Sequence, residues 1–211
     1  MRKLESVREY IHENEKQRHP QLKKEFGKKK KLPRGYGLHA LVALSHYPEL
    51  KDISIEFVFM ETDATAYCRP VFSTLLESAK ERTYRVAISK KIRKDKEPVR
   101  FHNLSFSAQI GVIAHELGHV ANFIEKSAFE MAELGIKYLS DNNFKRSLEI
   151  GTDLKAIQHG FGYQILEYAV LIEEMKKKYP DEPYYQSYFS FYMTPKEIMA
   201  AINELEGELE T

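Results

Sequence analysis

The order of apolar and polar residues along the chain predicts three strands in its first half. In residues 53–60, large apolar side chains such as Ile55 and Phe57 occur at every second position, the period that places them on one face of a strand. We expect a second strand at residues 65–69, and the same alternation recurs at residues 83–89. The predicted strands therefore precede the longest predicted helices.

Apolar residues spaced three and four apart predict helices in the rest of the chain. In residues 144–178 this spacing contains Gly160, so we expect either one long helix or two helices joined near that glycine. Thr194, Pro195 and Glu197 form a start signal for a final helix. The expected helices lie at residues 4–17, 39–47, 105–125, 127–139 and 144–178 and after residue 194.

Strands followed by long helices predict an α+β fold, in which a small, mainly antiparallel sheet packs on a helical bundle. A chain of 211 residues is long enough to bury one core. Residues 1–34 differ from the rest, because they carry 12 Lys or Arg against 5 Glu, a net charge of +7, whereas residues 35–211 carry −6. We therefore predict a basic helical N-terminal arm at residues 1–34 and a single domain at residues 35–211.

The overall composition excludes several classes of protein. Hydrophobic residues make up 43% of the chain and charged residues 30%, which is too apolar for a disordered protein. The longest apolar runs fall far short of the roughly 18 residues that span a bilayer, so no membrane segment is expected. Cys68 is the only cysteine, which rules out an internal disulfide and fits a reducing compartment. Because no apolar signal core follows the N-terminus, we expect a cytoplasmic protein.

A run of four lysines at residues 28–31 could bind nucleic acid or another polyanion. Such runs also occur as solvated linkers. No aromatic side chain is interleaved with these lysines to stack on bases. The arm therefore makes a weak case for a nucleic-acid partner, and none is predicted.

The sequence contains the motif H-E-x-x-H at residues 115–119, within the helix expected at 105–125. Residues four apart lie about 40° apart around a helix, so His115 and His119 project from one face and can bind the same metal ion. Glu116 lies on the adjoining flank, where it can take a proton from a metal-bound water. The motif thus provides two candidate metal ligands and a candidate general base.

Simpler interpretations of the motif exist. His115 and His119 could be histidines of the apolar core, and Glu116 could be a structural partner of a buried cation. The apolar run at residues 110–114 favours a binding role, because an unpaired ionisable group in such surroundings is costly. Gly118 costs about 1 kcal/mol relative to Ala inside a helix, which predicts close backbone packing beside the motif.

A hydrolytic zinc site usually has three protein ligands and an open position for water. No third histidine follows at the metzincin spacing, so the third ligand must lie elsewhere. Glu149 and Asp153 are one turn apart on the helix expected at 144–178 and share a face. Glu149 can bind the metal, while Asp153 can accept the second N–H of His115 and fix its tautomer. The pair also fits an ordinary polar helix face.

The H-E-x-x-H motif followed by this E-x-x-x-D pair resembles the gluzincin metallopeptidases, the thermolysin-like group, over about residues 83–165. The resemblance implies a zincin-like domain with Zn²⁺ as cofactor. The roles that it implies are zinc binding by His115, His119 and Glu149, general-base catalysis by Glu116, and orientation of His115 by Asp153.

The resemblance also implies an antiparallel edge strand beside the active-site helix that receives extended substrate, and residues 83–90 match it in order and pattern. Thermolysin-like enzymes further use a downstream His or Tyr to stabilise the oxyanion, for which this sequence shows no motif. His159 and Tyr163 are the first candidates for that role, and Tyr84 and His102 are others. His159 also fits an ordinary helix-end residue, because a glycine follows it.

We therefore expect a zinc-dependent metallopeptidase that hydrolyses peptide bonds of a peptide or protein substrate by a zinc-bound water, with Glu116 as general base. The alternative is a non-catalytic zinc-binding interaction module on the same fold, in which the arm or the tyrosine-rich segment at residues 179–192 binds a partner. The tyrosines of that segment could otherwise pack in the core or form the wall of a cleft. The sequence defines no oligomeric state.

Overall fold

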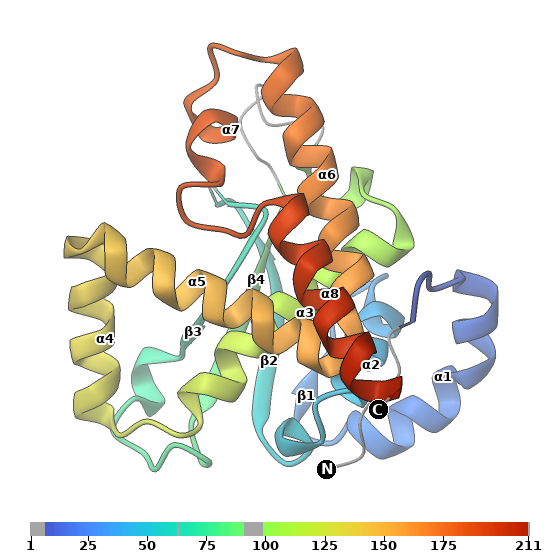
Figure 1. Cartoon of the computed structure of the whole chain (residues 1–211). Coiled ribbons are helices and arrows are strands. Elements are labelled where there is room, and N and C mark those ends of the chain that lie inside the picture. Colours follow the sequence, from blue (N-terminus) through green and yellow to red (C-terminus); the bar gives the residue numbers. More distant parts are fainter. Residues whose placement is uncertain (1–6, 63, 91–98, 211) are drawn as a thin grey trace.

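The protein is described by a computed structural model that covers residues 7–62, 64–90 and 99–210. The chain forms a four-stranded sheet on which the central helix and its neighbours pack (Figure 1). Helices and strands follow in the order α1 His12–Phe26, β1 Lys30–Lys31, α2 Gly37–Ser45, β2 Ser54–Met60, β3 Ala66–Pro70, β4 Thr83–Ser89, α3 Phe106–Phe123, α4 Ala128–Ser140, α5 Asn142–Ala156, α6 Gly162–Lys178, α7 Pro183–Tyr188 and α8 Pro195–Glu210.

The sheet is mixed, with the strand order β1-β2-β4-β3. β1 pairs with β2 and β2 with β4 in parallel, whereas β3 pairs with β4 antiparallel. The α+β class is confirmed, but the prediction of a mainly antiparallel sheet is wrong. Alternating apolar residues indicate which face of a strand is buried and carry no information on the direction of its neighbours.

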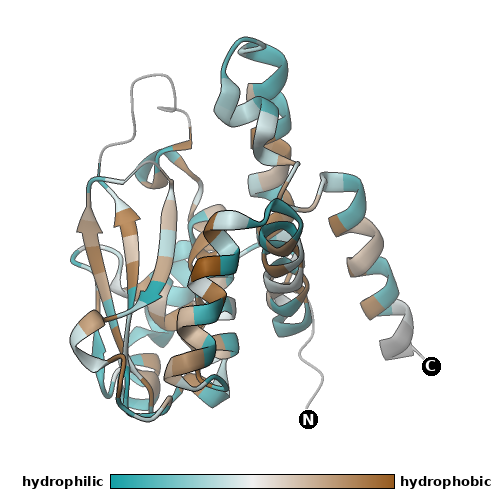
Figure 2. Ribbon diagram, turned by 90° about the vertical axis from the view of Figure 1, so that its left-hand side faces the viewer, coloured by the Kyte–Doolittle hydropathy of each residue, from teal (hydrophilic) through white to brown (hydrophobic). Residues whose placement is uncertain are grey.

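β3 is the edge strand, and β4 lies between β2 and β3. Val86 of β4 is opposite Phe57 of β2 on one side and opposite Cys68 of β3 on the other. The expectation that residues 83–90 form the edge strand beside the active-site helix is therefore wrong. The chain runs from β2 to β3 at the far edge of the sheet before it returns as β4. The alternation of apolar and polar residues within a strand does not reveal this crossover. In Figure 2, where the strands lie at the left, apolar and polar residues are interspersed along them.

The described part of the N-terminal segment packs onto the domain. Tyr10, Leu22 and Phe26 are buried in the same apolar core as α2 and α3. The Tyr10 amide donates to Ser107 Oγ at 2.8 Å, and Gln164 of α6 donates to a backbone carbonyl of this segment at 2.8 Å. Side chains of residues 7–34 thus pack in the same core as those of the rest of the chain.

The first helix lies later than expected. Of the predicted span 4–17, residues 4–6 lie outside the described residues, and α1 begins only at His12. It continues past Pro20, although an internal proline commonly ends a helix. Burial of Leu22 and Phe26 beyond the proline contributes about 1.5–3 kcal/mol each, enough to offset the roughly 3 kcal/mol that an internal proline costs.

Part of the lysine run is engaged within the fold. Lys30 belongs to β1, and its ammonium group donates to the backbone carbonyls of Lys28, Lys51 and Ile53 at 3.1, 2.9 and 2.7 Å. Burial lowers the pKa of Lys30 to about 8. This lysine therefore has partners within the fold.

Of the two alternatives for residues 144–178, the structure shows two helices joined near Gly160. Between α5 and α6 the chain forms a single wide turn at Ile157–Phe161, where Gly160 has a φ of 86°, a conformation that favours glycine. α6 then packs against α3 so closely that a Cβ on Gly111 would lie 2.7 Å from the backbone carbon of Gln164. The short helix α7 was not predicted. Along the described residues, none of the helices combines the length and apolar character that a membrane crossing requires.

Candidate metal centre

The H-E-x-x-H motif lies on α3, the helix at the centre of the fold. Ser105 begins this helix by accepting a hydrogen bond from the Ala108 amide, and most residues that follow are buried. A Cβ on Gly118 would meet the Thr152 Cγ2 atom at 3.0 Å and the Thr152 carbonyl oxygen at 3.3 Å. The prediction of close packing at Gly118 is therefore confirmed, and its neighbour in that contact is α5.

α5 brings the predicted carboxylates to the two histidines. The helix begins at Asp141, whose side chain accepts hydrogen bonds from two backbone amides. The Oε2 atom of Glu149 lies 3.2 Å from His115 Nε2 and 3.3 Å from His119 Nε2. One donor atom from each of these three residues lies within 4.8 Å of the others. His115, His119 and Glu149 thus form a cluster that could hold a metal ion.

Hydrogen bonds fix the orientation of both imidazole rings. Asp153 Oδ1 lies 2.8 Å from His115 Nδ1. The Thr152 hydroxyl donates to the Leu148 carbonyl at 2.8 Å, which leaves its oxygen free to accept from His119 Nδ1 at 3.2 Å. With a metal ion bound, the Nδ1 atom of each ring would carry the proton and Nε2 would offer its lone pair to the ion, whereas a proton on Nε2 can otherwise bond Glu149.

The charges of the cluster favour a cation at the point where its donor atoms meet. Burial opposes a charge on His115, but hydrogen bonds to Asp153 and Glu149 outweigh it and raise its pKa well above the ordinary value. Burial likewise opposes ionisation of Glu149, and the hydrogen bonds from His115 and His119 nevertheless hold its pKa far below the usual range. A positive charge, whether a proton or a metal ion, is therefore stabilised between these side chains.

Glu116 lies beside the cluster without joining it. Its side chain is buried, with 6% of the residue exposed, and its Oε2 atom has no hydrogen-bond partner among the described residues. Burial raises the pKa of Glu116, although the nearby histidines His115 and His119 lower it. A buried carboxylate oxygen needs a hydrogen-bond donor, so this atom is suited to accept a hydrogen bond from a group in the pocket.

The donor set fits zinc better than the harder divalent cations. Two imidazole nitrogens and one carboxylate oxygen form the three-ligand set that zinc takes in hydrolytic sites, whereas Mg²⁺ and Ca²⁺ prefer oxygen ligands alone. Glu116, whose Oε2 atom has no partner among the described residues, lines the same pocket as His115. The donor chemistry of these residues therefore fits a zinc ion.

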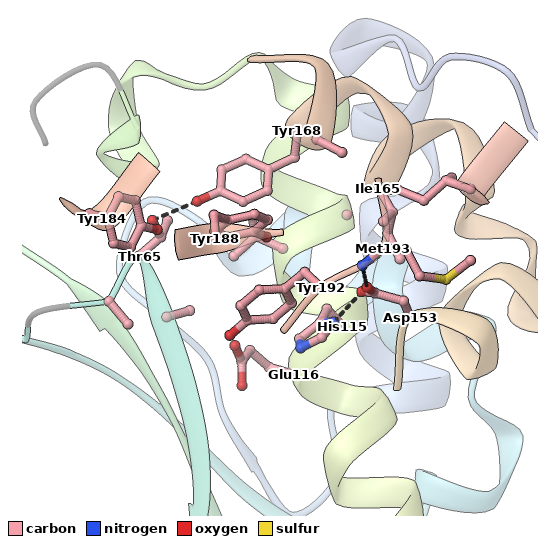
Figure 3. A pocket seen from close by; sticks show the side chains of 16 residues that line it. Thr65, His115, Glu116, Asp153, Ile165, Tyr168, Tyr184, Tyr188, Tyr192 and Met193 are labelled. Carbon is pink, nitrogen blue, oxygen red and sulfur yellow. Dashed lines mark hydrogen bonds and ion pairs between the residues drawn. The ribbon is translucent and has the colours of Figure 1, made fainter. Parts of the chain in front are cut away.

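A pocket with tyrosine walls opens onto His115 and Glu116 (Figure 3). Tyr168 is held there by a 2.8 Å hydrogen bond between its hydroxyl and Thr65 Oγ1. Tyr192 places its ring centre 5.8 Å from that of His115, and in Figure 3 its hydroxyl points toward Glu116. The lining residues include Ala64, Thr65, Ala66, Gly111, Val112, Ile165, Tyr168, Tyr184, Tyr188 and Tyr192.

The side chains first considered for an oxyanion role lie elsewhere. His159 stacks on Tyr47 with ring centres 4.1 Å apart, and its Nε2 atom lies 3.0 Å from Glu49. The Tyr163 hydroxyl donates to Glu206 of α8. Tyr84 donates to a backbone carbonyl at 2.7 Å, and His102 borders a separate hollow. None of these four residues lines the pocket at His115 and Glu116.

The structure adds three polar residues that the sequence reasoning did not place at the site. Thr152 orients His119, Tyr138 of α4 donates to Glu149 Oε1 at 2.6 Å, and Tyr192 faces Glu116. Burial, together with the adjacent Glu149 carboxylate, raises the pKa of Tyr138, so its hydroxyl stays protonated and able to donate. Tyr192 belongs to the tyrosine-rich segment at residues 179–192, for which the wall of a cleft is one of the interpretations that the sequence allows. Nothing in the sequence marks Thr152 or Tyr138, because both are common polar residues whose contacts with the site depend on how α4 and α5 pack.

Comparison of the chain with protein-family models, curated proteins and solved structures finds no match. The residues of the metal centre are therefore the basis on which a function can be assigned.

Proposed function

We propose that the chain is a zinc-dependent metallopeptidase of the gluzincin type, with a zincin-like domain. The observation that carries the proposal is the convergence of His115, His119 and Glu149 within 4.8 Å beside a buried Glu116 whose Oε2 atom has no partner in the described part of the chain. A metal site that served only to brace helices would not need an unpartnered acid facing a pocket. The single cysteine fits our further proposal of a cytoplasmic location.

Each polar residue has a distinct task in this proposal. His115, His119 and Glu149 would hold zinc, and a bound zinc ion supplies Lewis acidity toward a substrate carbonyl and an attacking water. Glu116 accepts the proton of that water and returns it to the leaving amine. Asp153 keeps the His115 ring in place through its 2.8 Å hydrogen bond. No covalent acyl-enzyme is required.

The position of β3 at the edge of the sheet favours a peptide as the substrate. β3 is antiparallel to β4 and packs beside α3, and within residues 7–62, 64–90 and 99–210 no strand pairs with its outer side. Ala64, Thr65 and Ala66, where β3 begins, also line the pocket at His115. An extended peptide can add to such an edge through backbone hydrogen bonds, which would carry its carbonyl groups past the metal centre. β3 thus takes the role that we first expected for residues 83–90.

We expect zinc analysis to find about one ion per chain, because the three donor atoms define one site. The measurement is elemental analysis after purification without chelator and reconstitution with zinc, paired with an assay on a peptide library. A chain that binds no transition metal would contradict the proposed site. Stoichiometric zinc with no hydrolysis of any peptide would instead support the non-catalytic interaction module.

We expect Tyr192→Phe to lower kcat by about 10²-fold with little change in KM or in zinc content. The Tyr192 hydroxyl points into the pocket beside Glu116, where it can donate to the oxyanion that forms during attack on the carbonyl. Tyr163→Phe is the control, because that hydroxyl bonds Glu206 outside the pocket. Loss of activity in the control with full activity in Tyr192→Phe would assign the oxyanion role to Tyr163 instead.

A further inference from the structure

The two oxygen atoms of Glu149 have different partners. Oε2 faces the Nε2 atoms of His115 and His119 at 3.2 and 3.3 Å. Oε1 instead accepts a hydrogen bond of 2.6 Å from the hydroxyl of Tyr138. This bond is shorter than either contact of Oε2, and a hydrogen bond to a carboxylate is among the stronger ones in proteins.

Tyr138 is held in place for this contact by its surroundings on α4 and α5. The helix begins with a capping box in which Ser127 and Glu130 bond each other's backbone amides. Lys145 of α5 lies over the Tyr138 ring, with its ammonium nitrogen 5.1 Å from the ring centre. The phenol therefore contacts one oxygen of Glu149 while the histidines contact the other.

We infer that Tyr138 is a positioning residue that makes Glu149 a one-oxygen metal ligand. A carboxylate can bind zinc through one oxygen or through both, and the second mode would use a further coordination position. Because Oε1 is bonded to Tyr138, Oε2 alone would bind the ion, and a further coordination position would then be left for water or the substrate carbonyl. This inference rests on the metal site of the proposed function, but it concerns coordination and not hydrolysis.

The test compares Tyr138→Phe with the wild-type chain and with Tyr163→Phe, a matched control. Tyr163 also donates its hydroxyl to a glutamate, Glu206, but outside the metal centre. We expect Tyr138→Phe to weaken zinc binding about 10-fold in a chelator competition, the lower end of the effect of removing a partner of a metal ligand. Tyr163→Phe should bind zinc as the wild type does.

The decisive readout is the visible spectrum of the cobalt-substituted proteins. Co²⁺ absorbs more strongly in a four-coordinate site than in a five-coordinate one, so a second oxygen from Glu149 should weaken the bands of Tyr138→Phe. The bands of Tyr163→Phe should match those of the wild type. Unchanged bands and unchanged zinc affinity in Tyr138→Phe would overturn the inference.

A crystal structure of the zinc-loaded wild-type chain provides a second test that does not depend on folding of the variant. We expect one Glu149 oxygen on the ion and the other on the Tyr138 hydroxyl, and both oxygens on the ion would overturn the inference. Failure of the proposed function looks different. A chain that shows these spectral and affinity differences but hydrolyses no peptide would contradict the peptidase and support the role of Tyr138.

Discussion

Glu116→Gln is expected to keep zinc and the fold while peptide hydrolysis falls by at least about 10²-fold. Glutamine has nearly the same shape as glutamate but cannot accept a proton from the attacking water, and a general base contributes about 10²- to 10⁴-fold to rate. A 10²-fold loss corresponds to about 2.7 kcal/mol in the activation free energy. Glu116 does not belong to the cluster of His115, His119 and Glu149, so zinc content should stay near that of the wild type.

The fold should tolerate Glu116→Gln, and the melting temperature of the variant checks that a loss of activity does not come from unfolding. Glu116 is buried and its Oε2 atom meets no donor from the described residues, so replacing the carboxylate by a neutral amide removes a buried charge without breaking a hydrogen bond at that atom. We expect a melting temperature equal to or above that of the wild type. Glu206→Gln on α8 is the control, because its side chain contacts Tyr163 and not the pocket. Unchanged turnover in Glu116→Gln would rule out Glu116 as the base while leaving the zinc site intact.

The parts of the site that could be predicted from the sequence are those that depend on spacing along one helix. His115 and His119 lie one turn apart on α3, and Glu149 and Asp153 lie one turn apart on α5. Helical geometry alone places each pair on a common face. We predicted that the two pairs lie together because a zinc site needs a third protein ligand. The structure does bring all four residues together.

The predictions that were wrong, and the site residues that were not predicted, concern contacts between segments far apart in the sequence. The position of β3 at the sheet edge follows from a crossover, and the packing of α1 follows from the burial of Leu22 and Phe26. Tyr138 and Tyr192 belong to the site only because α4 and the segment after α7 fold back over α3 and α5. A period of two or 3.6 residues describes one element and its buried face, so it cannot specify such neighbours.

Glu149→Ala should abolish stoichiometric zinc binding, whereas Asp153→Asn should weaken it by about 10- to 100-fold with zinc still bound at saturation. The first change removes a donor atom and the negative charge that balances the ion, and it also leaves the Tyr138 hydroxyl without its acceptor. The second change keeps the volume of the side chain and only weakens the support of His115.

The cost of Asp153→Asn follows from what Asp153 contacts. Its Oδ1 atom lies 2.8 Å from His115 Nδ1, and its Oδ2 atom accepts the Met193 amide at 3.2 Å. An asparagine has one carbonyl oxygen, so its amide group must face one of these two donors, and either the imidazole or the segment beside the pocket loses its anchor. Competition titration with a chromogenic chelator measures both variants. If Asp153→Asn abolished zinc binding while Glu149→Ala left it unaltered, the two roles would have to be exchanged, and the resemblance to the gluzincins would lose its main support.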